Sequence, residues 1–279
     1  MKKLDKAYGK CVVLDGERVQ AVVAPGMGMS LVRFSVDGEQ LLDLKREQAF
    51  LDYRKGLGPI ILPFFGQRST FPELDYDRFV HVEHLRKSNV RDPFQHGVGR
   101  YASWAIEEDK NSVTGYLRGD DRLNDFMLRD LTGFDFTASL TYRLVDGALE
   151  ISFDVSADHT VATGIHFYYD LKNRGTATVK IPQKDGITTV RFDRALDDVF
   201  QPAEASGEVT CTLETDSYSL DTRIRTTGAP EDTFDSVVVF SPQGESFACI
   251  EPVSYLVRSE NTKQANRGKI FLKPISRSM

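Results

Sequence analysis

The chain has 279 residues, 41% hydrophobic and 27% charged, which is enough apolar material for a sizeable core, and we predict one domain over residues 1–279. Its net charge of −6 argues against nucleic acid as a partner, because phosphate backbones attract clustered lysine and arginine. No stretch approaches the ~20 apolar residues of a membrane span, and no apolar run follows the N-terminal lysines, so we expect no membrane partner and a cytoplasmic location.

The first predicted element is a hairpin from Val22 to Leu42 that turns at Asp37-Gly38. A short helix is expected over residues 46–54, where helical periodicity is strongest. Residues 79–85 are predicted as a strand. His81 and His84 would then face opposite ways, so a shared metal is not expected, and both should lie at an edge or on the surface.

A second hairpin is predicted between Phe134 and Val155, where apolar and polar residues alternate on both sides of an Asp146-Gly147 turn. A two-residue turn of this type fixes the register of the two strands. It pairs each apolar residue with an apolar partner on one face; the expected pairs are Leu144 with Leu149, Tyr142 with Ile151, and Leu140 with Phe153.

Further short strands are predicted at residues 217–225, 236–240 and 247–250. Because helical periodicity is weak elsewhere, the pattern indicates an all-β fold built as a large antiparallel β-sandwich.

Residues 92–104 combine a histidine with residues that suit a binding site. His96 is followed by Gly97 and Gly99, which let the backbone turn tightly or lie close to a ligand. Arg100 comes next. The imidazole of His96 and the guanidinium of Arg100 could therefore point at one small polar molecule.

Residues 163–171 predict a strand with two different faces. Phe167 and Tyr169 belong to an apolar face, whereas His166 and Tyr168 belong to the opposite one. This second face is suited to a polar cavity, and we predict that Tyr168 contributes to it.

Glu251 follows an apolar strand, and Phe247 and Cys249 share its face. A carboxylate beside such neighbours loses hydration, which raises its pKa and makes it a better proton acceptor near neutrality. The alternative is that Glu251 ends the strand and faces water.

The three cysteines are Cys11, Cys211 and Cys249, which lie far apart and lack Cys-x-x-Cys spacing. This arrangement argues against a disulfide framework or a structural zinc site. The sequence also lacks a phosphate-cradling or metal-ligand motif, so we expect no metal and no cofactor.

Together with residues 58–68 and 196–200, these segments resemble the motifs of the aldose 1-epimerase (galactose mutarotase-like) family, in the family's order. The likeness is closest to the hexose-6-phosphate mutarotase branch, which has a Pro-x-x-Gly run, a His-Gly-x-x-Arg segment, a His-x-Tyr-Phe-like strand and a Cys-Val-Glu-Pro-like strand. The resemblance spans nearly the whole chain. It implies a two-sheet supersandwich with its site in the concave face of one sheet.

The resemblance also implies an isomerase that interconverts the α and β anomers of a hexose or hexose 6-phosphate. A base removes the proton from the C1 hydroxyl while an acid protonates the ring oxygen, and the opened aldehyde rotates and recloses. In this reading Glu251 is the base, His166 is the acid, and His96 binds near the ring oxygen or the hydroxyls.

Substrate-binding roles are implied for Arg68, Arg100 and Asp198. Asp197 competes with Asp198, because a one-residue slip exchanges the faces of a strand, and motif alignment favours Asp198. Two arginines favour a phosphorylated sugar, since guanidinium forks match phosphate oxygens. The alternative is that one arginine binds a neutral hydroxyl while a structural carboxylate holds the other. The sequence departs from the family in Gly-Val-Gly-Arg for Gly-Phe-Ala-Arg and in Phe167-Tyr168 for Thr-Tyr, which alters the pocket wall.

Two other functions fit the same scaffold. One is a catalytically silent carbohydrate-binding module, and the other is a lyase or isomerase that abstracts a carbon-bound proton. An acid and a base on one ligand favour catalysis, because binding alone needs neither. The expected partner is a small-molecule sugar or sugar phosphate, and the expected assembly is a monomer or homodimer.

Overall fold

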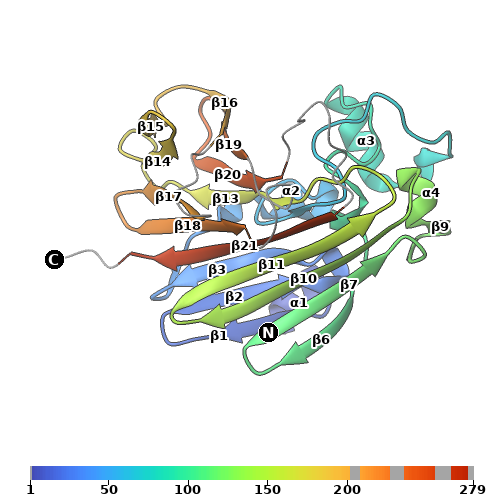
Figure 1. Ribbon diagram of the computed structural model, residues 1–279, viewed down its shortest axis with the longest axis horizontal. Coiled ribbons are helices and arrows are strands. Elements are labelled where there is room, and N and C mark those ends of the chain that lie inside the picture. The colour runs from blue at the N-terminus through green and yellow to red at the C-terminus, as the bar shows by residue number, and fades with distance from the viewer. Residues whose placement is uncertain (1, 202–207, 227–235, 255–264, 276–279) are drawn as a thin grey trace.

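Antiparallel strands dominate residues 2–201, 208–226, 236–254 and 265–275, the ranges that the computed structural model of the chain describes (Figure 1). The largest sheet within these ranges has nine strands. In spatial order they are β15 (Gly186–Arg191), β14 (Thr178–Gln183), β17 (Glu208–Glu214), β18 (Ser219–Thr226), β21 (Ala265–Pro274), β11 (Ala148–Ala157), β10 (Phe136–Val145), β7 (Ser112–Arg118) and β6 (Ala105–Asp109).

A four-stranded sheet packs against this large sheet and closes the sandwich (Figure 1). Its strands are β1 (Val12–Asp15), β2 (Val19–Ala24), β3 (Ser30–Val36) and β4 (Glu39–Gln40). Phe34 from β3 and Tyr142 from β10 are fully buried in the shared core. The Tyr142 hydroxyl donates to the Met29 carbonyl at 2.8 Å, which satisfies its polar end inside the core. The predicted all-β antiparallel sandwich is confirmed.

The hairpin of β10 and β11 has the predicted register, with Leu144 opposite Leu149 and Tyr142 opposite Ile151. Its turn residues Asp146 and Gly147 have φ values of 49° and 74°, as a two-residue hairpin turn with two left-handed positions requires. Local alternation and turn chemistry therefore specify this part of the core.

A third sheet has six strands in the described ranges and carries the candidate site. It contains β16 (Leu196–Phe200), β19 (Ser236–Ser241), β20 (Phe247–Val253), β12 (Gly164–Ile165) and β5 (Ile60–Ile61) in that order, and β13 (Phe167–Asp170) pairs with β20. Isolated bridges from Leu31 to Gly58 and from Leu42 to Tyr169 connect this region to the four-stranded sheet.

The described ranges also contain short helices; they are α1 (Lys2–Tyr8), α2 (Glu47–Tyr53), α3 (Val80–Lys87) and α4 (Leu128–Thr132), with 3₁₀ turns at Pro25–Met27, Leu44–Arg46, Tyr76–Arg78 and Val98–Arg100. A two-stranded ribbon joins β8 (Arg122–Leu123) to β9 (Phe126–Met127). Helix α2 confirms the predicted helix. Within the described ranges, every helix is too short or too polar to cross a membrane.

The strand predicted over residues 79–85 is wrong, because most of this segment forms helix α3. His81, Val82 and Leu85 are buried along one side of the helix, at helical spacing. His81 is therefore not a surface residue: its Nε2 lies 2.9 Å from the Pro93 carbonyl and its ring stacks on Tyr101. Burial lowers the pKa of His81 to about 4, which keeps this imidazole neutral.

Candidate active site

The floor of the site is one face of the six-stranded sheet. Strand register places Asp197, Phe240, Cys249 and Tyr168 in one row across four strands. Glu251 lies in the next row on the same face, opposite Val238. Side chains that alternate with these point to the other face of the sheet.

A cavity of about 280 Å³ opens above this floor, close to the lower end of the ~300–1,000 Å³ typical of small-molecule sites. Its wall combines apolar, aromatic and ionisable groups; the lining residues are Lys55, Phe65, Gln95, His96, Arg100, His166, Tyr168, Asp197, Val238, Phe240 and Glu251. The predicted residues Glu251, His166, His96, Arg100 and Tyr168 are thus brought together.

His166 and Glu251 contact each other directly at the centre of the cavity. The His166 Nδ1 and the Glu251 Oε1 are 2.8 Å apart, and each residue is about 95% buried. The opposite ring nitrogen, Nε2, is buried and has no hydrogen-bond partner among the described residues. A buried polar atom of this kind costs stability unless a ligand or water satisfies it, so Nε2 is available to a bound molecule.

Burial shifts the pKa values of both groups toward their neutral forms. Desolvation raises the pKa of Glu251 to about 8, although Cys249 and Arg100 oppose this rise. Desolvation lowers the pKa of His166 well below 6.5, and the positive charges of Arg100 and Lys55 act in the same direction. At neutral pH the pair therefore consists mainly of a carboxylic acid and a neutral imidazole.

His96 is held by a tight turn that its glycine neighbour permits. A Cβ at Gly97, whose φ is 91°, would meet the Leu62 carbonyl oxygen at 1.8 Å. The Gly66 backbone N–H donates to the His96 Nδ1 at 3.1 Å, so Nδ1 carries no proton. Burial lowers the pKa of His96 well below 6.5, and the neutral ring therefore carries its proton on Nε2. Its centroid lies 4.6 Å from that of His166, edge to face.

Arg100 and Lys55 supply the positive charge of the cavity. The Arg100 Nε donates to the Ile60 carbonyl at 3.0 Å, which anchors the buried guanidinium beside β5. Its Nη2 is buried and has no partner in the described part of the chain. Arg100 therefore keeps a donor for a ligand, and Lys55 places a second cation nearby.

The preference for Asp198 does not agree with the structure, which puts Asp197 in the cavity wall instead. Asp198 lies in the register row of Val239 and Ile250, the row that faces the core. It pairs instead with Arg194 at 3.1 Å. The motif favoured Asp198, one residue after the one that lines the cavity. Because neighbouring side chains on a strand point to opposite faces, this difference of one residue moves the side chain away from the cavity.

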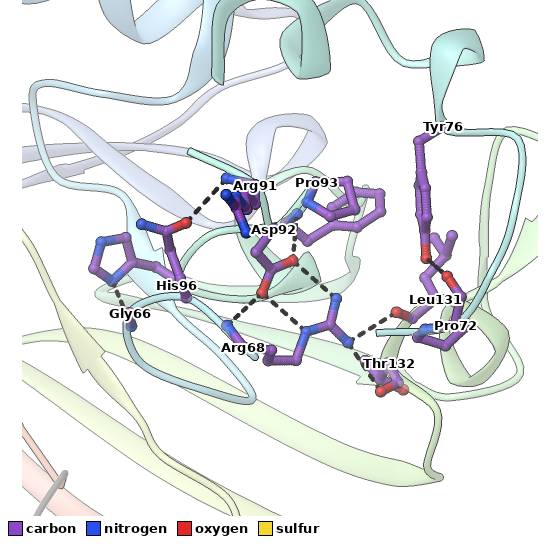
Figure 2. Close-up of polar contacts among 12 residues, drawn as sticks. Gly66, Arg68, Pro72, Tyr76, Arg91, Asp92, Pro93, His96, Leu131 and Thr132 are labelled. Carbon is purple, nitrogen blue, oxygen red and sulfur yellow. Dashed lines mark hydrogen bonds and ion pairs between the residues drawn. The ribbon is translucent and has the colours of Figure 1, made fainter. Parts of the chain in front are cut away.

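Arg68 does not line the cavity, so the structure does not support its predicted contact with substrate. Its Nε and Nη2 form a fork with the two Asp92 oxygens, each at 3.0 Å, while Nη1 donates to the Leu131 and Thr132 carbonyls (Figure 2). Four of its five N–H groups are thus used within the protein. Arg68 therefore connects Asp92, in the segment that leads to His96, to the carbonyls of residues 131–132.

Besides Asp197, which was the alternative to Asp198, five cavity residues were not among the predicted site residues: Lys55, Phe65, Gln95, Val238 and Phe240. Lys55 follows helix α2 in a loop, whereas Phe65 and Gln95 lie within the predicted motif segments 58–68 and 92–104. No periodicity or motif marks Lys55. Gln95 could have been found, because it directly precedes His96.

No protein-family model and no curated protein matches the chain, but solved structures match over almost its whole length. A galactose mutarotase related enzyme from Lactobacillus acidophilus is 16% identical with a TM-score of 0.66, covering 96% of this chain and 98% of that one. A galactose mutarotase-like protein from Lactobacillus casei is 13% identical with a TM-score of 0.62, covering 95% and 100%. An aldose epimerase homologue from C. elegans is 11% identical with a TM-score of 0.66, covering 96% and 99%. These likenesses show that the chain has the galactose mutarotase-like β-sandwich fold.

Proposed function

We propose that this protein is an aldose 1-epimerase that interconverts the α and β anomers of a hexose or hexose 6-phosphate. The observation that carries the proposal is the 2.8 Å contact between Glu251 and His166 in a cavity sized for a small ligand. Ring opening needs a proton acceptor at the C1 hydroxyl and a donor at the ring oxygen. Glu251 and His166 supply both, side by side.

The direct contact allows a proton relay within the pair. With Glu251 protonated on Oε1, Oε2 accepts the proton of the C1 hydroxyl while Oε1 passes its own proton to the His166 Nδ1. His166 then donates the proton on Nε2 to the ring oxygen. Each protein group gains one proton and loses one, so no isolated charge forms in the buried cavity. Ring closure on the other face reverses the steps.

The remaining cavity groups bind and orient the sugar. The Nε2–H of the neutral His96 and the unpartnered Nη2 of Arg100 are donors, and Asp197 at the cavity wall is an acceptor for hydroxyl groups. Phe65 and Phe240 offer apolar contact to the sugar ring. These contacts hold C1 and the ring oxygen against the catalytic pair.

The first test is the decay of optical rotation of freshly dissolved α-glucose or α-galactose, with protein that has been dialysed against a chelator. We expect faster decay than in buffer without added metal or nucleotide, because the relay uses protein groups alone. Binding of the sugar without any acceleration would support a carbohydrate-binding module instead.

A second expectation concerns the charge of the substrate. Arg68 does not line the cavity and therefore does not support a phosphate site there. Arg100 and Lys55 do line it and place two cations at the cavity. A hexose 6-phosphate should therefore exceed the free hexose in kcat/KM by ~10-fold or more, and added salt should narrow the gap. Lys55→Met should reduce this preference, whereas Lys45→Met, which removes an exposed lysine, should leave it unchanged. Equal efficiencies for the two sugars in the wild type would limit the proposal to neutral aldoses.

A further inference from the structure

Three different donor atoms meet at the floor of the cavity. The His166 Nδ1 lies 2.8 Å from the Glu251 Oε1 and 3.5 Å from the Cys249 Sγ. All three donor atoms are within 4.8 Å of one another, and all three residues are buried. The mechanism uses His166 and Glu251 but gives no task to the thiol of Cys249.

The arrangement does not suit a nucleophilic cysteine. In a nucleophile–histidine–acid triad, the nucleophile and the acid contact opposite nitrogens of the imidazole ring. Here Cys249 and Glu251 both approach the same nitrogen, Nδ1. Burial also raises the pKa of the Cys249 thiol well above 9, which is the reverse of the shift that activates a thiol.

The same convergence does suit a metal ion. Ligand atoms bound to Zn²⁺ at ~2.0–2.3 Å in a tetrahedron stand roughly 3.3–3.7 Å from one another. The distance of 3.5 Å between the sulfur and the nitrogen already falls in this range, and the 2.8 Å hydrogen bond must lengthen slightly. The sheet fixes the positions, because Cys249 and Glu251 are two residues apart on β20 and His166 directly precedes the neighbouring strand β13.

The chemistry of the donors selects the type of ion. Thiolate and imidazole prefer Zn²⁺ and similar cations over Mg²⁺ or Ca²⁺, which take oxygen ligands. A thiolate and a carboxylate would neutralise the two positive charges of the ion, which matters because Arg100 also lines this cavity. Since His166 and Glu251 line the open cavity, an ion can enter there and keep its fourth position for water.

We infer that Cys249, His166 and Glu251 form a binding site for a thiophilic divalent cation such as Zn²⁺, and that this cation inhibits the protein. On binding, the Cys249 thiol and the Glu251 carboxyl group each release a proton to solvent and bind as thiolate and carboxylate, while the imidazole keeps one proton on Nε2. The cation then coordinates both His166 and Glu251, so neither group is free to transfer a proton. The inhibition rests on the proposed function, whereas the binding does not.

Binding is tested without any sugar, by titrating the metal-free protein with Co²⁺ as a spectroscopic substitute for Zn²⁺. We expect a near-ultraviolet charge-transfer band from a cobalt–thiolate bond, and displacement of Co²⁺ by Zn²⁺. Cys249→Ser should abolish the band and weaken Zn²⁺ affinity on the order of 100-fold. Cys11→Ser should leave both unchanged, because the half-buried Cys11 lies outside the site.

Glu251→Gln is a second variant that keeps the thiol. It should retain the band but bind Co²⁺ more weakly, since one anionic ligand is lost. The absence of a band in the wild type, its survival in Cys249→Ser or its loss in Cys11→Ser would overturn the site. If the wild type accelerates mutarotation, Zn²⁺ should inhibit it reversibly by chelator, and full activity with Zn²⁺ bound would overturn the inhibition. A protein that binds Co²⁺ as described but never accelerates mutarotation would contradict the proposed function alone.

Discussion

Glu251→Gln should lower kcat for anomer interconversion by ~10²–10⁴, which is the usual contribution of a positioned acid–base group. The amide keeps the shape of the carboxyl group and can still hydrogen-bond to His166, but it cannot accept the proton of the C1 hydroxyl. His166→Asn should cause a loss in the same range. The measurement is optical rotation at saturating sugar, and turnover near that of the wild type would show that Glu251 is not the base.

The free energy of unfolding of Glu251→Gln distinguishes the loss of a catalytic group from misfolding of the variant. Folding raises the pKa of the Glu251 carboxyl group from 4.5 to about 8. Its contribution to the free energy of unfolding is therefore fully present below pH 4.5, decreases above that pH, and is lost once pH has risen through 8. The amide does not titrate. The free energy of unfolding of Glu251→Gln relative to the wild type should therefore increase by up to about 1.4 kcal/mol per pH unit between these values. Glu150→Gln, at a buried carboxylate of the nine-stranded sheet, should leave kcat unchanged.

Asp92→Ala should lower the free energy of unfolding by about 3–5 kcal/mol, because it removes one partner of a buried ion pair. Asp92 is fully buried, and besides the Arg68 guanidinium it accepts the backbone N–H groups of Arg68 and Phe94 (Figure 2). All of these donors would be left without their acceptor. Denaturant unfolding followed by fluorescence measures the change.

The matched control is Asp120→Ala. Asp120 pairs with Arg129 on the surface, where the two side chains are 70% and 43% exposed, so its removal should cost less than about 1 kcal/mol. Equal losses for the two variants would show that the Asp92 pair is not a structural clamp.

The sequence predicted the parts of the fold that local rules determine. The register of β10 and β11 follows from alternation and from the Asp146-Gly147 turn. Five of the eleven cavity residues were also predicted. Among them, His166 and Tyr168 alternate with core residues, and Glu251 shares a face with Cys249. These relations hold within one strand or one hairpin.

The errors depend on partners that lie far away in the sequence. Whether Asp197 or Asp198 faces the cavity is set by pairing with β19, about 40 residues later. The role of Arg68 is set by Asp92 and by carbonyls of residues 131–132, which no local pattern reveals. Helix α3 was missed because residues 80–83 alternate between apolar and polar side chains as in a strand, and a histidine, His81, occupies its buried side.

The most direct test is the rate of exchange between the anomeric protons of an aldose at equilibrium, measured by exchange NMR with metal-free wild-type protein from pH 5 to pH 9. The relay predicts exchange faster than in buffer, with a decline as pH rises through about 8, where Glu251 loses the proton that it passes to His166. Protonation of His166 should reduce the rate only well below pH 6.5, because its pKa is lowered. An excess of the exchange rate over that of buffer that rises through pH 8 would contradict the relay. An exchange rate equal to that of buffer at every pH, for free and phosphorylated hexoses alike, would contradict the function.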